Sequence, residues 1–112
     1  MSVEEAFSRT KVATIANGEN LSDAIPIKEA RSGIIVVGST MSGSSLSFQG
    51  CDTVNGTFLD IENGSSVPLA ANITHAPIIV PIPSGAMTLN FLKIKSSSNE
   101  GAARSLTVIV KS

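Results

Sequence analysis

The segment Ser45-Leu46-Ser47-Phe48-Gln49-Gly50-Cys51 alternates apolar and polar residues. Leu46 and Phe48 occupy even-numbered positions, whereas Ser47 and Gln49 occupy odd-numbered positions, the other parity of the segment. Successive side chains of an extended strand point to opposite faces of a sheet. This period of two therefore predicts a β-strand that buries one face and leaves the other in water.

The same alternation recurs on both sides of this segment. Leu106, Val108 and Val110 alternate with a second set of residues near the end of the chain, and Leu59 and Ile61 alternate with two acids. The pairs Asn17-Gly18, Asn55-Gly56 and Asn63-Gly64 supply residues that tolerate the positive φ of tight turns. We expect strands near residues 11–16, 21–27, 33–40, 45–51, 57–62, 66–70, 77–82, 88–96 and 105–111.

Many short strands separated by turns predict an all-β fold, an antiparallel β-sandwich or jelly-roll-like single domain. The chain has 112 residues, of which 42% are hydrophobic and 15% charged, so it can form one modest core and is not intrinsically disordered. No segment of helical length carries an apolar stripe. We expect the sandwich to span residues 11–112 and to follow an N-terminal arm of residues 1–10.

Charge and cysteine content exclude several classes of protein. The net charge is −1, so no electrostatic footprint for nucleic acid or for an anionic membrane surface is present. No apolar stretch approaches the ~20 residues of a spanning helix, and we expect no signal peptide. The single cysteine, Cys51, excludes an internal disulfide, which favours synthesis in a reducing cytoplasm.

Side chains able to do chemistry are few and scattered. His75 is the sole histidine and is expected in a turn, and Cys51 is expected to be a small, buried and unreactive thiol. Asp60 and Glu62 share one strand face and are expected to be solvated rather than catalytic. The Ser-rich segment 38–45 lacks the lysine and the following helix of a phosphate loop. We therefore predict no enzyme activity, no catalytic residue, no metal site and no cofactor.

The aromatic content argues against a sugar-binding site. The sequence has four phenylalanines and neither tryptophan nor tyrosine, the residues on which sugars usually stack. Phe48, Phe58 and Phe91 lie in strand patterns and are expected in the core. Phe7 lies in the otherwise polar N-terminal arm, and we consider it, together with Val3, a candidate anchor into a neighbouring molecule.

Association is suggested by residues 76–83, Ala-Pro-Ile-Ile-Val-Pro-Ile-Pro, which are apolar on both parities. The prolines in or beside strands restrict those strands to sheet edges or bulges. No lysine or arginine occurs between Arg31 and Lys93, which is unusual for the surface of a free monomer. The stretch 76–83 is either a buried strand interrupted at a sheet edge or an edge placed against another subunit. On the second interpretation we predict an intersubunit seam formed by four apolar residues: Ile78, Ile79, Val80 and Ile82.

Five segments carry a resemblance to a known group of proteins: residues 13–25, the Gly-Ile-Ile-Val-Val strand at 33–37, residues 45–51, residues 55–61 and residues 91–96. In this order, over about residues 12–110, the chain resembles small virion proteins of tailed bacteriophages. The resemblance implies a β-sandwich or jelly roll that assembles on phage shells, necks or tails, often as a homotrimer. It supplies no catalytic residue, and the Trp or Tyr positions of related chains are missing, which disfavours a receptor-binding role.

We accordingly expect a non-enzymatic virion structural protein, made in the host cytoplasm and located in the virion. The leading hypothesis is a capsid decoration (cement) protein that forms a homo-oligomer, with a trimer favoured, and clamps the major capsid protein. One alternative is a neck, tail or fibre-attachment component of the same particle. A second is a glycan-binding module for host-surface attachment, using polar loops such as 39–45 or 96–104.

Overall fold

The computed structural model describes residues 8–62 and 68–112, and this part of the chain forms two antiparallel sheets packed face to face. The first sheet has the strand order β1 (Ser8–Ile15), β9 (Arg104–Lys111), β3 (Ser32–Val37) and β7 (Ile78–Pro81). The second has the order β2 (Ile25–Pro26), β8 (Phe91–Ser96), β4 (Ser45–Cys51) and β5 (Leu59–Asp60), and β6 (Ala70–Asn72) also pairs with β4. The predicted all-β sandwich is confirmed.

Strand alternation places the core between the sheets, as the sequence indicated. Leu46 and Phe48 of β4 face Leu106, Val108 and Val110 of β9 across the interior, all 2% exposed or less. Both ends of the described chain meet in the first sheet, where β1 pairs with β9 along its full length, from Ser8 opposite Lys111 onwards. Other buried apolar side chains come from five more strands: Ala13, Ile15, Ile25, Ile35, Val37, Val80, Leu92 and Ile94. The connecting segments add six more: Ile27, Ala30, Met41, Ile73, Ile82 and Ala86.

One of the predicted Asn-Gly turns and two of the prolines lie as the sequence predicted, whereas Gly56 of Asn55-Gly56 lacks the expected positive φ and Asn63-Gly64 lies outside the described residues. Gly18 has φ +84°, the left-handed conformation that the Asn17-Gly18 turn requires. Pro26 lies in β2 and Pro81 in β7, and both are edge strands, where a missing backbone donor breaks no ladder.

The observed strand boundaries differ most from the expected ones where the alternation of apolar and polar residues is weak. The strand expected at 21–27 shortens to β2, and the one expected at 66–70 is replaced, in the described residues, by β6 at Ala70–Asn72. The strand expected from residue 88 begins at Phe91, because the 3-10 helix η1 (Ser84–Thr88) occupies the preceding residues. β1 extends from Ser8, so residues 8–10, which we had assigned to the arm, pair within the first sheet.

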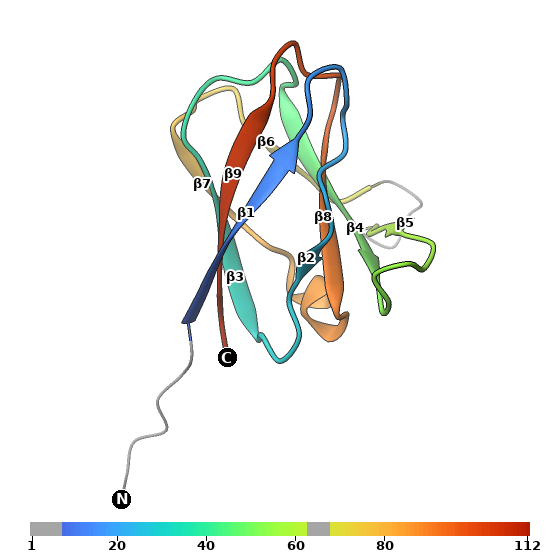
Figure 1. Cartoon of the computed structure of the whole chain (residues 1–112). Coiled ribbons are helices and arrows are strands. Elements are labelled where there is room, and N and C mark those ends of the chain that lie inside the picture. Colours follow the sequence, from blue (N-terminus) through green and yellow to red (C-terminus); the bar gives the residue numbers. More distant parts are fainter. Residues whose placement is uncertain (1–7, 63–67) are drawn as a thin grey trace, which may run out of the picture.

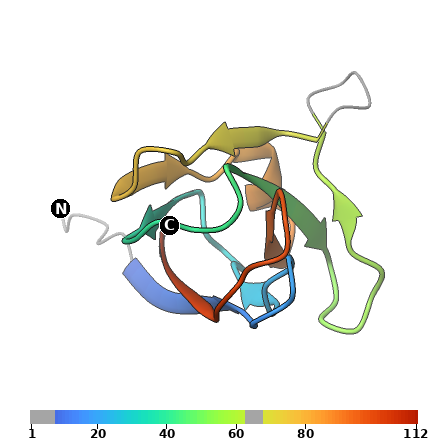
Figure 2. The ribbon, with the colours of Figure 1, turned by 90° about the horizontal axis from the view of Figure 1, so that it is seen from above.

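Four apolar or thiol side chains are more exposed than predicted. Leu59 is 67% exposed because β5 forms only a two-residue pairing beyond the edge of the core, in a segment that stands away from the two sheets (Figure 2). Phe58 and Phe91 are half-buried rather than core residues, unlike Phe48. Cys51 is also half-buried, with Sγ 3.9 Å from Thr53 Oγ1.

One buried carboxylate, Glu100, connects the loops at the upper end of Figure 1. Its Oε1 accepts hydrogen bonds from the Ser42 amide and from Arg104 Nε, both at 2.8 Å. Its Oε2 accepts from the Gly43 amide at 3.0 Å and from Ser96 Oγ at 2.7 Å. Loop 38–44 is therefore fastened to the β8–β9 turn across a sequence distance of more than fifty residues.

The backbone of Glu100 continues this connection into a third loop. The Gly18 amide donates to the Glu100 carbonyl at 2.7 Å, and the Glu100 amide donates to the Glu19 carbonyl at 2.8 Å. The β1–β2 loop thus joins the other two. Since the two loops considered for glycan binding, 39–45 and 96–104, are among these, their adjacent parts are held by internal hydrogen bonds.

Ionisation of Glu100 should contribute to folding stability. Burial by itself raises the pKa of this carboxyl, but the hydrogen bonds to it favour the charged form and hold the pKa below its ordinary value of 4.5. The unfolded chain therefore binds the proton more tightly than the folded chain. The stabilisation is complete above pH 4.5 and is lost as the pH falls through the lower, folded-state pKa.

We expect Glu100→Gln to lower the free energy of unfolding at pH 7 by about 2 kcal/mol, because the amide nitrogen of glutamine would face a backbone N–H instead of accepting from it. The variant should also lose part of the acid sensitivity of the wild type. Urea unfolding followed by circular dichroism between pH 7 and pH 3 measures both effects. Glu19→Gln, an exposed glutamate at the same end, is the matched control; equal effects of the two changes would contradict the role of Glu100.

Gly43 offers an independent test of the same junction. A Cβ at this position would lie 2.1 Å from Ser96 Oγ and 3.0 Å from the Ser97 amide nitrogen, whereas a Cβ at Gly38 of the same loop meets nothing within 4 Å. Gly43→Ala should therefore destabilise the fold by about 1–3 kcal/mol, and Gly38→Ala by less than about 0.5 kcal/mol. Thermal melts of the two variants decide this, and comparable melting temperatures would count against the junction.

Candidate interaction surface

The outer face of the four-stranded sheet is apolar, although it points away from the core. Alternation along β3 and β7 turns Ile34, Val36, Ile79 and Pro81 outward, while their neighbours are buried. Val12 of β1 and Ile109 of β9 lie on the same side of the sheet. We call these six residues, Val12, Ile34, Val36, Ile79, Pro81 and Ile109, the apolar face.

Strand register arranges the apolar face in two rows that cross the sheet. In one row, Val12 pairs with Thr107, Thr107 with Val36, and Val36 with Ile79. In the next row, Thr10 pairs with Ile109, Ile109 with Ile34, and Ile34 with Pro81. Threonine methyl groups fill the two positions that lack a larger apolar side chain, so each row is continuous from one edge of the sheet to the other.

Two residues of the apolar face protrude furthest into solvent. Ile79 is 60% exposed and Val12 is 55% exposed, and they lie on the two edge strands, β7 and β1. The inner strands carry Ile34, Val36 and Ile109, which are half-buried. Near one end of the inner strands is a shallow hollow of about 310 Å³, lined by Ser32, Gly33, Ile34, Ile109 and Lys111.

Charge is almost absent from this surface. Among the outward-facing residues of β1, β3, β7 and β9, all of which the structure describes, Lys111 at the end of β9 is the single charged one. The remainder are the apolar face and the hydroxyl residues Ser8, Thr10, Thr14, Ser32, Ser105 and Thr107. An apolar patch without interspersed charge typically marks an interaction site.

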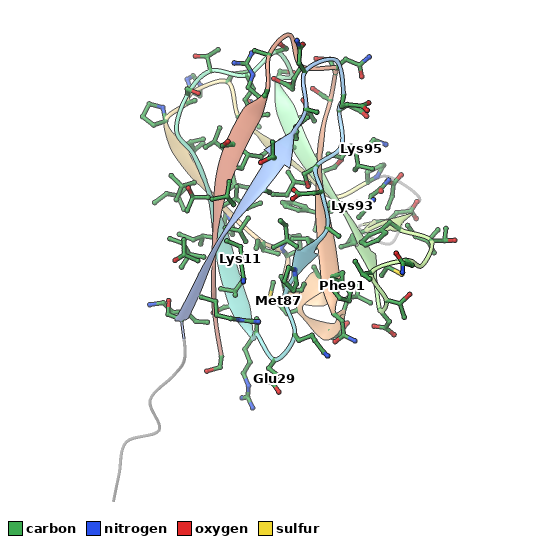
Figure 3. All side chains as sticks on the ribbon, in the orientation of Figure 1. Lys11, Glu29, Met87, Phe91, Lys93 and Lys95 are labelled. Atoms are coloured by element: carbon green, nitrogen blue, oxygen red, sulfur yellow. The ribbon has the colours of Figure 1, made fainter. Side chains whose placement is uncertain are left out.

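The opposite outer face, on the five-stranded sheet, has the polarity of an ordinary solvated surface. Lys93 and Lys95 project from β8 (Figure 3). Lys95 Nζ lies 3.8 Å from Asp60 Oδ1, which also accepts a hydrogen bond from Gln49 Nε2 at 2.9 Å. Lys93 Nζ lies 4.5 Å from the centroid of the Phe58 ring. The two faces of the sandwich therefore differ sharply in chemistry.

The structure separates the residues that the sequence assigned to a seam. Ile79 is exposed on the apolar face, but Val80 and Ile82, at 2% and 6% exposure, are buried in the core of this chain, and Ile78 packs against that core. The segment is apolar on both parities because one parity faces the interior and the other faces outward. The expectation that Val80 and Ile82 face another subunit is therefore wrong, Ile78 is partly buried, and Ile79 is the exposed member of the four. Val3 and Phe7 lie outside the described residues.

Sequence pattern missed most of the apolar face. Val12, Ile34, Val36 and Ile109 lie on three strands that are distant in sequence, β1, β3 and β9, and each alternates with a core residue. The strands at 33–37 and 105–111 carry apolar residues at both odd- and even-numbered positions, and this signal could have indicated an apolar outer face.

In the described part of the chain, His75 and Asp60, two of the side chains weighed for chemistry, have separate surroundings. His75 is exposed in a turn, as predicted, and Asp60 is engaged with Lys95 and Gln49 on the opposite face from Ile79. Within residues 8–62 and 68–112, no group of three or more His, Cys, Asp or Glu is placed to hold a metal ion. In the same part of the chain, no helix is long and apolar enough to span a membrane.

Comparison with known proteins identifies a solved structure with which this chain shares its fold. No protein family matches the chain, and no curated protein matches its sequence. Among solved structures, the chain is similar to the crystal structure of SPBc2 prophage-derived protein YomS, with a TM-score of 0.68 and 13% sequence identity. The alignment covers 100% of this chain and 99% of that chain. At this identity the similarity shows a shared β-sandwich fold over the whole length of both proteins.

The alternation of β7 can be tested by two adjacent truncations. Val80→Ala should lower the free energy of unfolding by about 2 kcal/mol, because it leaves a cavity in the core. Ile79→Ala should change it by less than about 0.5 kcal/mol, because the side chain is already in water. Chemical denaturation at low protein concentration measures both, and a larger effect for Ile79→Ala would reverse the assignment of the two faces.

Proposed function

We propose that this chain is a non-enzymatic structural protein of a phage virion, and specifically a capsid decoration protein that stabilises the major capsid shell. The observation that carries this proposal is the apolar face: two uncharged rows of side chains exposed across a whole sheet. Such a surface favours a protein that is completed by neighbouring subunits. Its partners are then further copies of the chain and a shell protein.

The fold supports a phage setting for the proposal. The similar structure is of a protein described as prophage-derived, and the two chains correspond over nearly their entire lengths. A small sandwich with a rigid, hydrogen-bonded loop end suits a building block, since its surfaces are held in place before assembly. The proposed location is the virion, following synthesis in the host bacterium.

The physical basis of decoration is linkage between binding and stability. DNA packed in a shell pushes the shell subunits apart. A protein that binds across subunit joints in the assembled shell, and binds free subunits less well, shifts the equilibrium toward the assembled state by mass action. No bond is made or broken in this function, so it requires buried apolar contact area and no reactive group.

A component of the neck or tail is the second candidate function for the same fold. The number of copies per particle distinguishes it from shell decoration. Shell decoration requires copies in proportion to the capsomers, whereas a neck or tail ring holds roughly six or twelve copies. The apolar face is compatible with both arrangements.

Particles produced by the genetic element that encodes this chain should contain it in numbers proportional to the major capsid protein. Quantitative mass spectrometry of purified particles measures this ratio. Deleting the gene should lower the temperature at which heads release their DNA, and adding purified protein back should restore it. Absence of the chain from intact particles would overturn the proposal, and a ring-like copy number would place the chain at the neck or tail.

A further inference from the structure

We propose that a second copy of this chain packs against the apolar face, with the four-stranded sheets of the two copies stacked on each other. This inference deepens the proposed function and rests on it, because it names the surface through which a virion structural protein would self-associate. The apolar face is composed of residues from all four strands of the first sheet.

The distribution of charge favours a second copy as the occupant. In a two-fold interface the same patch lies on both sides, so a charge near the two-fold axis would lie close to its own equivalent, and a charge elsewhere in the patch would be buried. The two central rows contain no charged residue, and Lys111 lies at the end of the sheet, where its side chain can extend into solvent. The opposite outer face, with Lys93 and Lys95 adjacent on β8, would place positive charges together in the same arrangement.

The shape of the apolar face is also compatible with its own copy. A two-fold axis parallel to the strands and between β9 and β3 places β1 of one copy over β7 of the other. The protruding Val12 then lies opposite Ile79 of the second copy, and Ile109 lies opposite Ile34 of the second copy. Sheets stacked in this aligned manner are about 10 Å apart, which is the separation at which such side chains meet.

The edges of the sheet offer a less favourable route to association. Pro81 removes a donor from the free edge of β7. On β1, the amide of Thr14 donates to Asp23 Oδ1 at 2.9 Å and its carbonyl accepts from the Asp23 amide at 3.2 Å, so that end of the edge is covered. Lys11 places a charge on the core-facing side of the same edge strand, which hinders addition of another strand.

The size of the surface sets the expected strength. The thirteen outward-facing positions of the four strands, at about 4.8 Å between strands and about 7 Å between rows, cover roughly 440 Å² per copy, or about 900 Å² in total. This total lies at the lower end of specific interfaces, where associations are weak. Self-association should therefore depend on concentration in solution and become strong when many copies are held together on one particle.

Sedimentation velocity over a concentration series tests the proposal on the full chain. The wild type should show a concentration-dependent dimer or higher oligomer. Val12→Asp and Ile79→Asp should each weaken association by more than about tenfold, because a carboxylate would be buried without a partner. The matched controls are Val54→Asp and Leu59→Asp, since these apolar side chains are 54% and 67% exposed but lie outside the apolar face.

A cross-linking test distinguishes the stacked arrangement from other contacts. In a Cys51→Ser background, the double variant V12C/I79C should be cross-linked between chains by a bismaleimide whose spacer spans about 10 Å, the separation of stacked sheets, and each single cysteine variant should be cross-linked far less. Thermal melts of all variants verify that the fold persists.

Three results would overturn the inference: a wild type that stays monomeric up to about 1 mM, aspartate variants on the apolar face that associate as the wild type does, or control variants that dissociate equally. None of these results depends on whether the chain is found in particles. A chain that is abundant in virions but monomeric in solution would retain the proposed function and remove the proposed surface.

Discussion

The buried carboxylate of Glu100 is the interaction on which the rest of this architecture depends. A small sandwich has two ends where the strands stop and backbone groups lose their partners. At one of these ends a single side chain accepts from the loop before β4, from the strand β8 and from Arg104, while its backbone joins the loop after β1. Connections from both sheets are thereby fixed relative to each other, and the two sheets keep one packing angle.

That fixed packing has a consequence for the outer faces. Because the core residues of β3, β7 and β9 are locked between the sheets, the alternating residues on these strands are presented in a constant arrangement. The apolar face is therefore a preformed surface, and association would order few additional groups. This reduces the entropy cost of binding, which matters for a surface whose area is small.

The two outer faces show how a protein with few charges can distribute them. Lys93, Lys95 and Asp60 are gathered on the five-stranded sheet, where they keep one side of the sandwich solvated. The four-stranded sheet is left without charge in its central rows. For a building block of a particle, this division would direct one side toward neighbours and the other toward water.

Local pattern determined the fold class and the core of the long strands. The period of two in β4 and β9 identified Leu46, Phe48, Leu106, Val108 and Val110 correctly, because each of these residues needs only its own strand to define its face. The Asn17-Gly18 turn and the edge positions of Pro26 and Pro81 followed from backbone chemistry in the same way.

Tertiary structure alone decided which residues form the apolar face and which loop acid is buried. The segment 76–83 is apolar on both parities, and only packing of β7 against β3 shows that Val80 faces inward and Ile79 outward. Glu100 looked like an ordinary loop acid until folding brought Ser42 and Gly43 beside it from more than fifty residues away. The apolar face belongs to four strands that are separated in the chain, and it exists because hydrogen-bond register aligns them, a long-range constraint that no local pattern of residues contains.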